Sequence, residues 1–299
     1  LDSDPERETG WENFLGGNIK GGVNWNIDEN HNVFVNMGDY SKQPFINAVF
    51  LNNQNIVNSN PRNEKVAGFE LGYGYTSEKF KANLNVYRTE WKDRFKSVGY
   101  RDGDIRGTAD LQGIKQLHTG VELDFTYDIT DNFRFLGMAS VGDWEYAGNV
   151  SGTAFDQDLQ AVGTVDLYLD GVKVGDAAQT TARIAFTYRV SDNLKFDVSQ
   201  FYATNLFPSI SASSFRTQAA NAQGSLELPG HTLMDAGVSY KFNVTEKVNA
   251  RFRLNVNNLM DTRYISDGFT NIHATAGSTT YKGVDVNNRV YFGYGRTWN

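Results

Sequence analysis

The side chains best suited to acid–base or metal chemistry in this sequence are its four histidines. They are His31, His118, His231 and His273, and no two of them have the i, i+4 or otherwise paired spacing of a zinc or catalytic site. Cysteine is absent, so a thiolate ligand or nucleophile is excluded, and no G-x-S-x-G or phosphate-binding glycine motif occurs. The sequence therefore predicts no enzyme, no metal site and no cofactor.

Two oxygen-rich segments offer a different metal chemistry. Asp102-Gly103-Asp104 and Asp156-Gln157-Asp158 each carry two carboxylates, and hard cations such as calcium bind oxygen ligands in loops. The spacing of an EF-hand is missing. A solvated loop is the default interpretation, and a calcium site is the alternative.

Aromatic side chains could bind a ligand by stacking. They make up 13% of the chain, and several fall near the ends of predicted strands, where a ring could stack on a sugar or an aromatic chelator. The candidate substrate-binding residues are Trp91, Trp144, Tyr146, Phe207, Phe215 and Tyr264. The favoured alternative is that these side chains form the aromatic girdle at the outer membrane interface, because they fall near the outer ends of the predicted strands.

A fourth group consists of arginines on the polar positions of predicted strands, namely Arg183, Arg189, Arg251 and Arg253. On the inner face of a barrel they could attract an anionic substrate. Pairing with carboxylates on a domain that fills the barrel is favoured, because charge inside a barrel needs partners or water.

Period-2 alternation predicts the elements that must position these residues. In residues 121–129, Val, Leu, Phe, Tyr and Ile alternate with Glu, Asp, Thr and Asp, and the same pattern occurs in residues 69–75, 182–190, 234–242 and 248–256. Such alternation makes one face of a strand apolar and the other polar. Segments of about 9–12 residues suit tilted strands that cross a bilayer.

The connections between these strands alternate between short and long. Polar turns occur at residues 28–30, 77–79, 130–132, 191–193 and 245–247, and long polar connections are predicted at 41–65, 100–117, 152–180, 208–230 and 267–288. Short turns at one end and long loops at the other are typical of outer-membrane barrels. We predict an all-β fold, a transmembrane antiparallel up-and-down β-barrel with about eleven strands here, the last at residues 289–299.

Composition excludes several other classes. Mean hydropathy is -0.48, and the apolar runs are far shorter than the roughly 20 residues of a membrane helix. The net charge of -7 and the lack of a basic run argue against nucleic acid as a partner. A soluble β-sandwich is the remaining alternative, although its strands are usually about 5–6 residues long.

Residues 254–264 carry a resemblance to a known family. The sequence Leu-Asn-Val-Asn-Asn-Leu-Met-Asp-Thr-Arg-Tyr resembles the late-strand signature of TonB-dependent outer-membrane receptors, with Asn-Leu, an apolar residue, Asp and then Tyr. Residues 288–296 resemble the final strand of that family, and residues 64–72 and 84–94 resemble its mid-barrel hairpins. The resemblance covers essentially the whole chain, and the residue choice is similar to that of receptors from Bacteroidota.

The resemblance implies a barrel of about 22 strands around an N-terminal plug. Residues 1–299 are then expected to be the C-terminal portion of the barrel, with the plug absent, because no plug-like region precedes the first strand and the chain stops at Trp298-Asn299. The implied partners are outer-membrane lipid, the protein's own plug and remaining strands, a TonB-type energy-transducing protein and a surface-exposed lipoprotein.

The implied function is active import of a bulky nutrient, such as a metal chelate or an oligosaccharide, across the bacterial outer membrane. A passive porin and a surface-binding barrel without transport are the alternatives. The sequence contains no feature that separates one substrate class from another, because extracellular loops are free of the membrane's patterning constraint.

Overall fold

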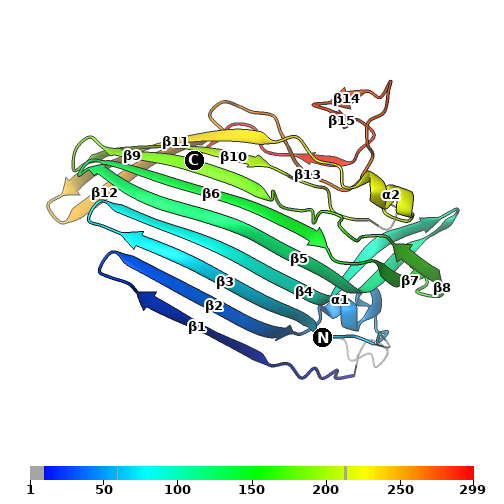
Figure 1. Cartoon of the computed structure of the whole chain (residues 1–299). Coiled ribbons are helices and arrows are strands. Elements are labelled where there is room, and N and C mark those ends of the chain that lie inside the picture. The colour runs from blue at the N-terminus through cyan, green and yellow to red at the C-terminus, as the bar shows by residue number, and fades with distance from the viewer. Residues whose placement is uncertain (1–9, 59, 212–213) are drawn as a thin grey trace.

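One antiparallel sheet dominates the computed structural model, which describes residues 10–58, 60–211 and 214–299. Its strands lie side by side with short turns at one end and long loops at the other (Figure 1). Along the main path they are β1 (Asn18–Asn26), β2 (His31–Lys42), β3 (Glu64–Thr76), β4 (Phe80–Asp102), β5 (Ile105–Thr130), β6 (Phe133–Tyr146), β9 (Thr180–Arg189), β10 (Leu194–Thr204), β11 (His231–Thr245), β12 (Val248–Asn257) and β17 (Thr297–Trp298).

The smaller elements belong to the long-loop end. They are α1 (Ile46–Val49), the short 3-10 helix η2 (Leu51–Asn53), β7 (Val150–Asp156), β8 (Ala161–Leu167), α2 (Gln218–Gln223), β13 (Ile265–Gly268), β14 (Thr280–Tyr281), β15 (Val284–Asp285) and β16 (Val290–Phe292). None of the helices in the described residues is long and apolar enough to cross a membrane.

The short turns share one local device. In each, the first polar side chain of the turn accepts a hydrogen bond from the backbone N–H three residues later, which closes the chain reversal. The acceptor and donor residues are Asp28 and His31, Ser77 and Phe80, Thr130 and Phe133, Ser191 and Leu194, and Thr245 and Val248. These are the turns that the sequence predicted.

The two faces of the sheet differ as the alternation requires. Leu71, Val86, Val121 and Val141 are directly opposite one another on four successive strands and form one apolar row. They are 42%, 47%, 44% and 58% exposed, respectively, so the protein itself does not cover them. A row of exposed aliphatic side chains on every strand is what lipid would cover.

Aromatic rings form a belt on this apolar face next to the short turns. Phe80 lies 6.0 Å from Tyr75 and 6.1 Å from Phe125, and the chain of ring contacts continues through Phe135, 5.2 Å from Phe125, to Phe186, 4.7 Å from Phe135. Such belts mark the level of a membrane interface. This belt lies at the short-turn end and contains none of the candidate ligand-binding aromatics, for which the sequence favoured a girdle at the opposite, outer end of the strands.

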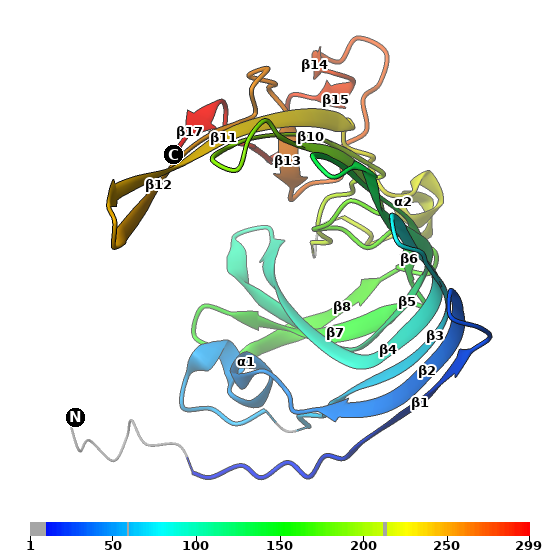
Figure 2. The ribbon, with the colours of Figure 1, turned by 90° about the vertical axis from the view of Figure 1, so that its left-hand side faces the viewer.

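The sheet curves and remains unclosed. Figure 2 shows its strands around an open arc, with β1 at one edge and β12 and β17 at the other. The strands in the main path number eleven, as predicted, and the all-β fold class is confirmed. β17 pairs with β12 over only two residue pairs, because β16 turns away to pair with β13. The prediction of one continuous last strand over 289–299 was wrong.

Two predicted connections, at 100–117 and 152–180, also contain strands. β4 and β5 continue as a hairpin to Asp102 and Ile105, so only two residues connect them, and the connection predicted at 100–117 does not exist. The end of this hairpin that lies farthest from the short turns pairs through β5 with β7, and β7 in turn pairs with β8. The hairpin, β7 and β8 lie within the outline of the arc in Figure 2. The sequence pattern had hidden these strands, because their apolar residues, such as Val98, Leu111 and Leu167, pack into a core of the long loops instead of facing lipid over the length of a bilayer.

We expect Leu123→Arg to lower the free energy of unfolding of the full-length protein in bilayers by about 2–4 kcal/mol. Leu123 is 39% exposed on the apolar face, between Leu84 and Ala139. Thr126→Arg, on the opposite face of the same strand, is the matched control and should have little effect. Urea titration of both variants checks this, and equal destabilisation would contradict the assignment of the faces.

Candidate functional site

The polar face of β1–β6 contains a hollow of about 930 Å³ near the long loops, here called the aromatic hollow. Polar and aromatic side chains from adjacent strands line it: Lys20, Asn36, Tyr40, Glu70, Tyr87, Thr89, Trp91, His118, Glu122 and Trp144. The cross-strand register makes this arrangement, because Tyr87 is opposite Glu70 and Gly120, and His118 is opposite Thr89 and Trp144. Period-2 geometry then turns all of these side chains to one side.

A network of contacts holds the aromatic rings in place. The indole N–H of Trp144 donates to the hydroxyl of Tyr87 at 2.9 Å. The His118 ring stacks on Trp144, with 5.2 Å between centroids and 14° between planes. At the rim, Arg94 donates to the side-chain oxygen of Gln116 and its guanidinium lies 5.0 Å from the Trp91 ring centroid. Fixed rings cost less entropy on binding than mobile ones.

The chemistry of the aromatic hollow suits a ring-shaped ligand with polar substituents. Trp91 and Trp144, both half-buried, offer apolar faces for stacking. Glu70 and Glu122 supply acceptors, and the Asn36 amide donates to Glu70 at 3.1 Å. A carbohydrate and an aromatic chelator both present this combination of apolar faces and polar edges.

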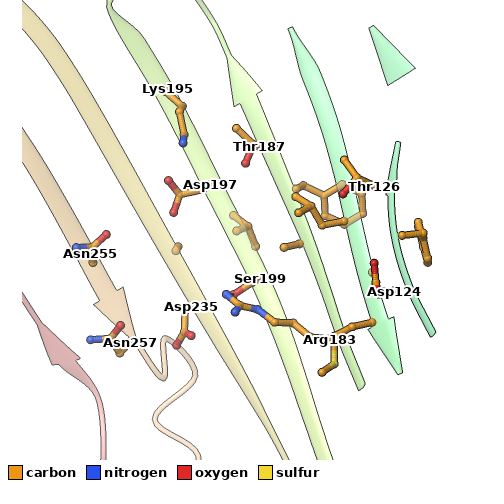
Figure 3. A pocket seen from close by; sticks show the side chains of 18 of the residues that line it. Asp124, Thr126, Arg183, Thr187, Lys195, Asp197, Ser199, Asp235, Asn255 and Asn257 are labelled. Carbon is orange, nitrogen blue, oxygen red and sulfur yellow. The ribbon is translucent and has the colours of Figure 1, made fainter. Parts of the chain in front are cut away.

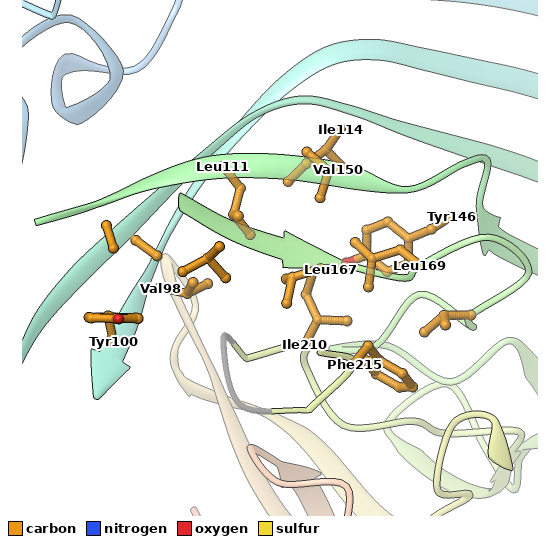
Figure 4. Packing of buried hydrophobic residues seen from close by; sticks show 14 residues of the cluster. Val98, Tyr100, Leu111, Ile114, Tyr146, Val150, Leu167, Leu169, Ile210 and Phe215 are labelled. Carbon is orange, nitrogen blue, oxygen red and sulfur yellow. The ribbon is translucent and has the colours of Figure 1, made fainter. Parts of the chain in front are cut away.

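The other four aromatic candidates lie elsewhere. Tyr146 and Phe215 are 4% and 2% exposed, within a hydrophobic core formed by the long loops (Figure 4). Phe207 is buried too. Tyr264 stacks on His231 at 4.2 Å and covers Gly293, where an added Cβ would meet the ring. In this structure their rings contact protein, and only Trp91 and Trp144 share a hollow.

Sequence reasoning missed the partners of these two tryptophans. Tyr87 lies four residues before Trp91 on the same face of β4, and Glu122 and His118 occupy alternate positions of β5. The even spacing of Tyr87 and Trp91 in a strand was therefore enough to predict that they share a face. Tyr40 and Glu70 could not be found in that way, because only the register between strands brings them to the hollow.

The four arginines all lie on the same polar face, and a second hollow of about 580 Å³ includes two of them (Figure 3). Arg183 donates to the hydroxyl of Ser199 at 3.0 Å, and Arg253 lies 3.4 Å from a carboxylate oxygen of Asp197. Arg189 and Arg251 line a third hollow beside the short turns.

A charged cluster ties the long loops together at Lys96. Its ammonium donates to the hydroxyl of Ser209 at 2.6 Å, and that hydroxyl lies 3.4 Å from a carboxylate oxygen of Asp176. Burial lowers the pKa of Lys96, and the nearby Asp176 and Asp267 oppose this shift. Burial and Asp176 raise the pKa of Asp267. One cation thus lies near carboxylates from two separate loops and is hydrogen-bonded to the serine that donates to one of them.

The acidic segments that raised the question of calcium lie in turns. Asp102–Asp104 closes the hairpin of β4 and β5, and Asp156 accepts backbone hydrogen bonds from Asp158 at 3.0 Å and Gln160 at 2.9 Å. In the described part of the chain, the structure brings together no group of three or more His, Asp or Glu side chains that could hold a metal ion.

Three features define the class of this protein: an exposed apolar face, polar hollows on the opposite face, and long loops at one end of the sheet. The chain forms part of the wall of a transmembrane β-barrel. Residues 9–259 match the family described as TonB dependent receptor-like, beta-barrel. The chain belongs to that family, whose barrels lie in the bacterial outer membrane.

Solved structures share the fold. The ferric-catecholate import receptor Fiu from E. coli K12 has a TM-score of 0.56 at 18% identity, over 93% of this chain and 33% of that one. The FrpB iron transporter from Neisseria meningitidis has 0.59 at 19%, over 93% and 37%. The copper transporter OprC has 0.61 at 15%, over 95% and 38%. The chain thus spans well under half the length of these proteins. No curated protein matches its sequence.

We expect Phe215→Ala to destabilise the folded loops by about 3–5 kcal/mol, because it empties part of their core. Trp91→Ala should leave them intact, since Trp91 lies on the wall. Hydrogen exchange of the β7 and β8 amides in the full-length protein measures this. Equal protection in both variants would contradict the role of this core.

Lys96→Met should loosen the loops at neutral pH, because Asp176 and Asp267 then lose the cation near both of them. Protonation of Asp267 relieves the repulsion, so protection should return as the pH falls through its raised pKa. Limited proteolysis at several pH values tests this. The double variant Lys96→Met/Asp267→Asn should be indifferent to pH over the same range, and a parallel response of both would refute the explanation.

Proposed function

We propose that this chain is the C-terminal portion of the barrel of a TonB-dependent transporter that imports a bulky nutrient. The observation that carries the proposal is the aromatic hollow, which lies on the inner face of the wall at the long-loop end. A ligand held by external loops would meet this hollow first. The short turns then face the periplasm, as in other outer-membrane barrels.

The proposal includes the parts that a transporter needs beyond these residues. An unclosed sheet leaves unpaired backbone groups at β1 and β12, which lipid cannot satisfy. The complete transporter would also contain the remaining strands and an N-terminal plug inside the barrel, and it would work with a TonB-type energy-transducing protein. A Bacteroidota origin and a surface-exposed lipoprotein that closes over the long loops are part of the same proposal.

The substrate that fits best is a ligand with stacking faces and polar edges, either a metal chelate with aromatic groups or an oligosaccharide. Two observations bear on the choice between a metal chelate and an oligosaccharide. The similar structures bear names of a ferric-catecholate import receptor, an iron transporter and a copper transporter, which favours the chelate. The pairing of tryptophan faces with Glu70, Glu122 and Asn36 suits either class.

Uptake by cells that carry the full-length protein tests the proposal. We expect Trp91→Ala and Trp144→Ala each to raise the substrate concentration that gives half-maximal uptake by about 2- to 10-fold, which is the effect of one lost stacking contact. Trp25→Ala is the matched control, since Trp25 is 64% exposed on the apolar face. Uptake that persists after the membrane is de-energised would instead indicate a passive porin, and no uptake would indicate a surface-binding barrel.

A further inference from the structure

Two stretches that the sequence singled out separately contact each other in the structure. Asn258, Asp261 and Tyr264, here called the clasp, belong to the late-strand signature and lie between β12 and β13. Residues 290–299, here called the return segment, contain the sequence Gly293-Tyr294-Gly295 and run antiparallel to this part of the chain, since β16 pairs with β13 and β17 pairs with β12. The two ladders are short, with three and two residue pairs, respectively.

Side chains of the clasp bond the return segment between these two ladders. The Asn258 amide donates to the carbonyl oxygens of Thr262 at 2.9 Å and Tyr294 at 3.2 Å. Asp261 accepts a hydrogen bond from the backbone N–H of Arg296 at 2.9 Å. Asn258 and Asp261 have φ angles of 49° and 52°, in the left-handed region that Asn and Asp tolerate better than most residues. The stretch is therefore a long bulge whose shape depends on these residue types.

The clasp is also attached to β11, on the side away from the return segment. The backbone N–H of Asn258 donates to a carboxylate oxygen of Asp235 at 2.8 Å, and the Tyr264 ring stacks on His231 with 4.2 Å between centroids. Asn258 is 4% exposed. Because β11 belongs to the main sheet, the clasp stays in place if the return segment slides.

The clasp leaves room only for glycine at two points of the return segment. A Cβ on Gly293 would collide with the Tyr264 ring, and a Cβ on Gly295 would lie 3.0 Å from a carboxylate oxygen of Asp261, which is an unusually close approach. The two glycines occupy alternate positions of an extended segment, so they lie on the same side of it. Each cramped place therefore meets one glycine.

These two places distinguish registers that the alternation of faces cannot. A slip of one residue would turn every side chain to the wrong face, whereas a slip of two residues keeps the faces. Backbone donors and acceptors repeat with the same period, so the hydrogen bonds of the clasp would be remade after such a slip. Sliding by two residues in one direction would place Tyr291 under the Tyr264 ring, and sliding in the other direction would place Thr297 against Asp261. The observed register gives glycine to both places.

We propose that the clasp and the two glycines form a register lock that sets how the barrel closes. Long strands fix their register by the summed packing of many residues, which the short ladders of the return segment cannot supply. β17 lies at an edge of the sheet, so the strand that joins its free edge takes its register from the return segment. Register around a barrel fixes strand tilt and diameter. The inference goes beyond import, because a passive barrel needs the same closure.

Disulfide formation between introduced cysteines reports the register in the full-length protein, and the 299 residues contain no cysteine of their own. Asn257→Cys/Thr297→Cys reports the observed register, in which these two residues are direct partners. Asn255→Cys/Thr297→Cys and Asn257→Cys/Asn299→Cys report the two slips. Direct partners lie about 4.5–5.5 Å apart between Cα atoms, within disulfide range, whereas diagonal neighbours at about 7–8 Å are too far apart to be bridged.

Each half of the lock should release one particular slip. Tyr264→Ala makes room for Tyr291, and we expect it to raise the 255–297 disulfide from background to about a tenth or more of the 257–297 disulfide. Asp261→Ala makes room for Thr297 and should raise the 257–299 disulfide instead. Yields are measured in protein inserted in the outer membrane. The same slip in both variants, or the observed register alone in both, would overturn the proposal.

Three controls separate the lock from a general loss of stability. Tyr264→Phe keeps the ring and Asp261→Asn keeps the oxygen, so both should give the 257–297 disulfide alone. Met260→Ala changes an exposed residue of the same stretch, 68% exposed, and should also leave the register unchanged. A slip in any of these three variants would contradict the lock.

Tyr291→Gly tests the same contact from the return segment and decides the question if the alanine variants fail to insert. Tyr291 is 61% exposed, so its removal empties no core, and the Tyr264 ring remains in place. Glycine at this position would clear the slip that Tyr291 now blocks. We expect the 255–297 disulfide to appear, and its absence in the inserted protein would refute the register lock.

Discussion

Backbone hydrogen bonding in lipid is the constraint on which the rest of this structure depends. No water is present in the bilayer core to bond an exposed N–H or C=O, so each strand must pair along its full length with neighbours. The eleven strands of the main path satisfy this by antiparallel ladders between successive segments, closed by turns in which a Ser, Thr or Asp side chain bonds the backbone. Along the main path of the described strands, the two edges of the arc remain unpaired.

That constraint governs one face of the wall and frees the other. Lipid requires the row of Leu71, Val86 and Val121 to be apolar, whereas the opposite positions of the same strands can carry Glu70, Glu122 or Asp124 at small cost. The chemistry of the inner face can therefore differ from one end of the wall to the other. It holds aromatic rings near the long loops on β1–β6 and cations near the short turns on β9–β12.

Beyond the membrane the loops follow the rules of a soluble protein. Water solvates their backbone, so they fold around a core of their own, with Leu111, Leu167 and Phe215 almost fully buried. This explains why aromatic residues with similar places in the sequence separate in space. Tyr146 turns into the loop core, while Trp144, two positions earlier on the same strand face, stays over the aromatic hollow. Lys96 then links the loops by charge.

The sequence by itself determined the strands, their two faces, the short turns and the number of wall segments, because a period of two and local turn chemistry are properties of neighbouring residues. It could not determine that the polar stretches at 100–117 and 152–180 contain strands, since no membrane imposes a pattern there. Tertiary structure alone decided which side chains meet across strands. Register brings Glu70 to Tyr87, Tyr87 to Trp144 and Lys241 to Arg251, and register is fixed by the summed packing of whole strands rather than by any residue's neighbours in the chain.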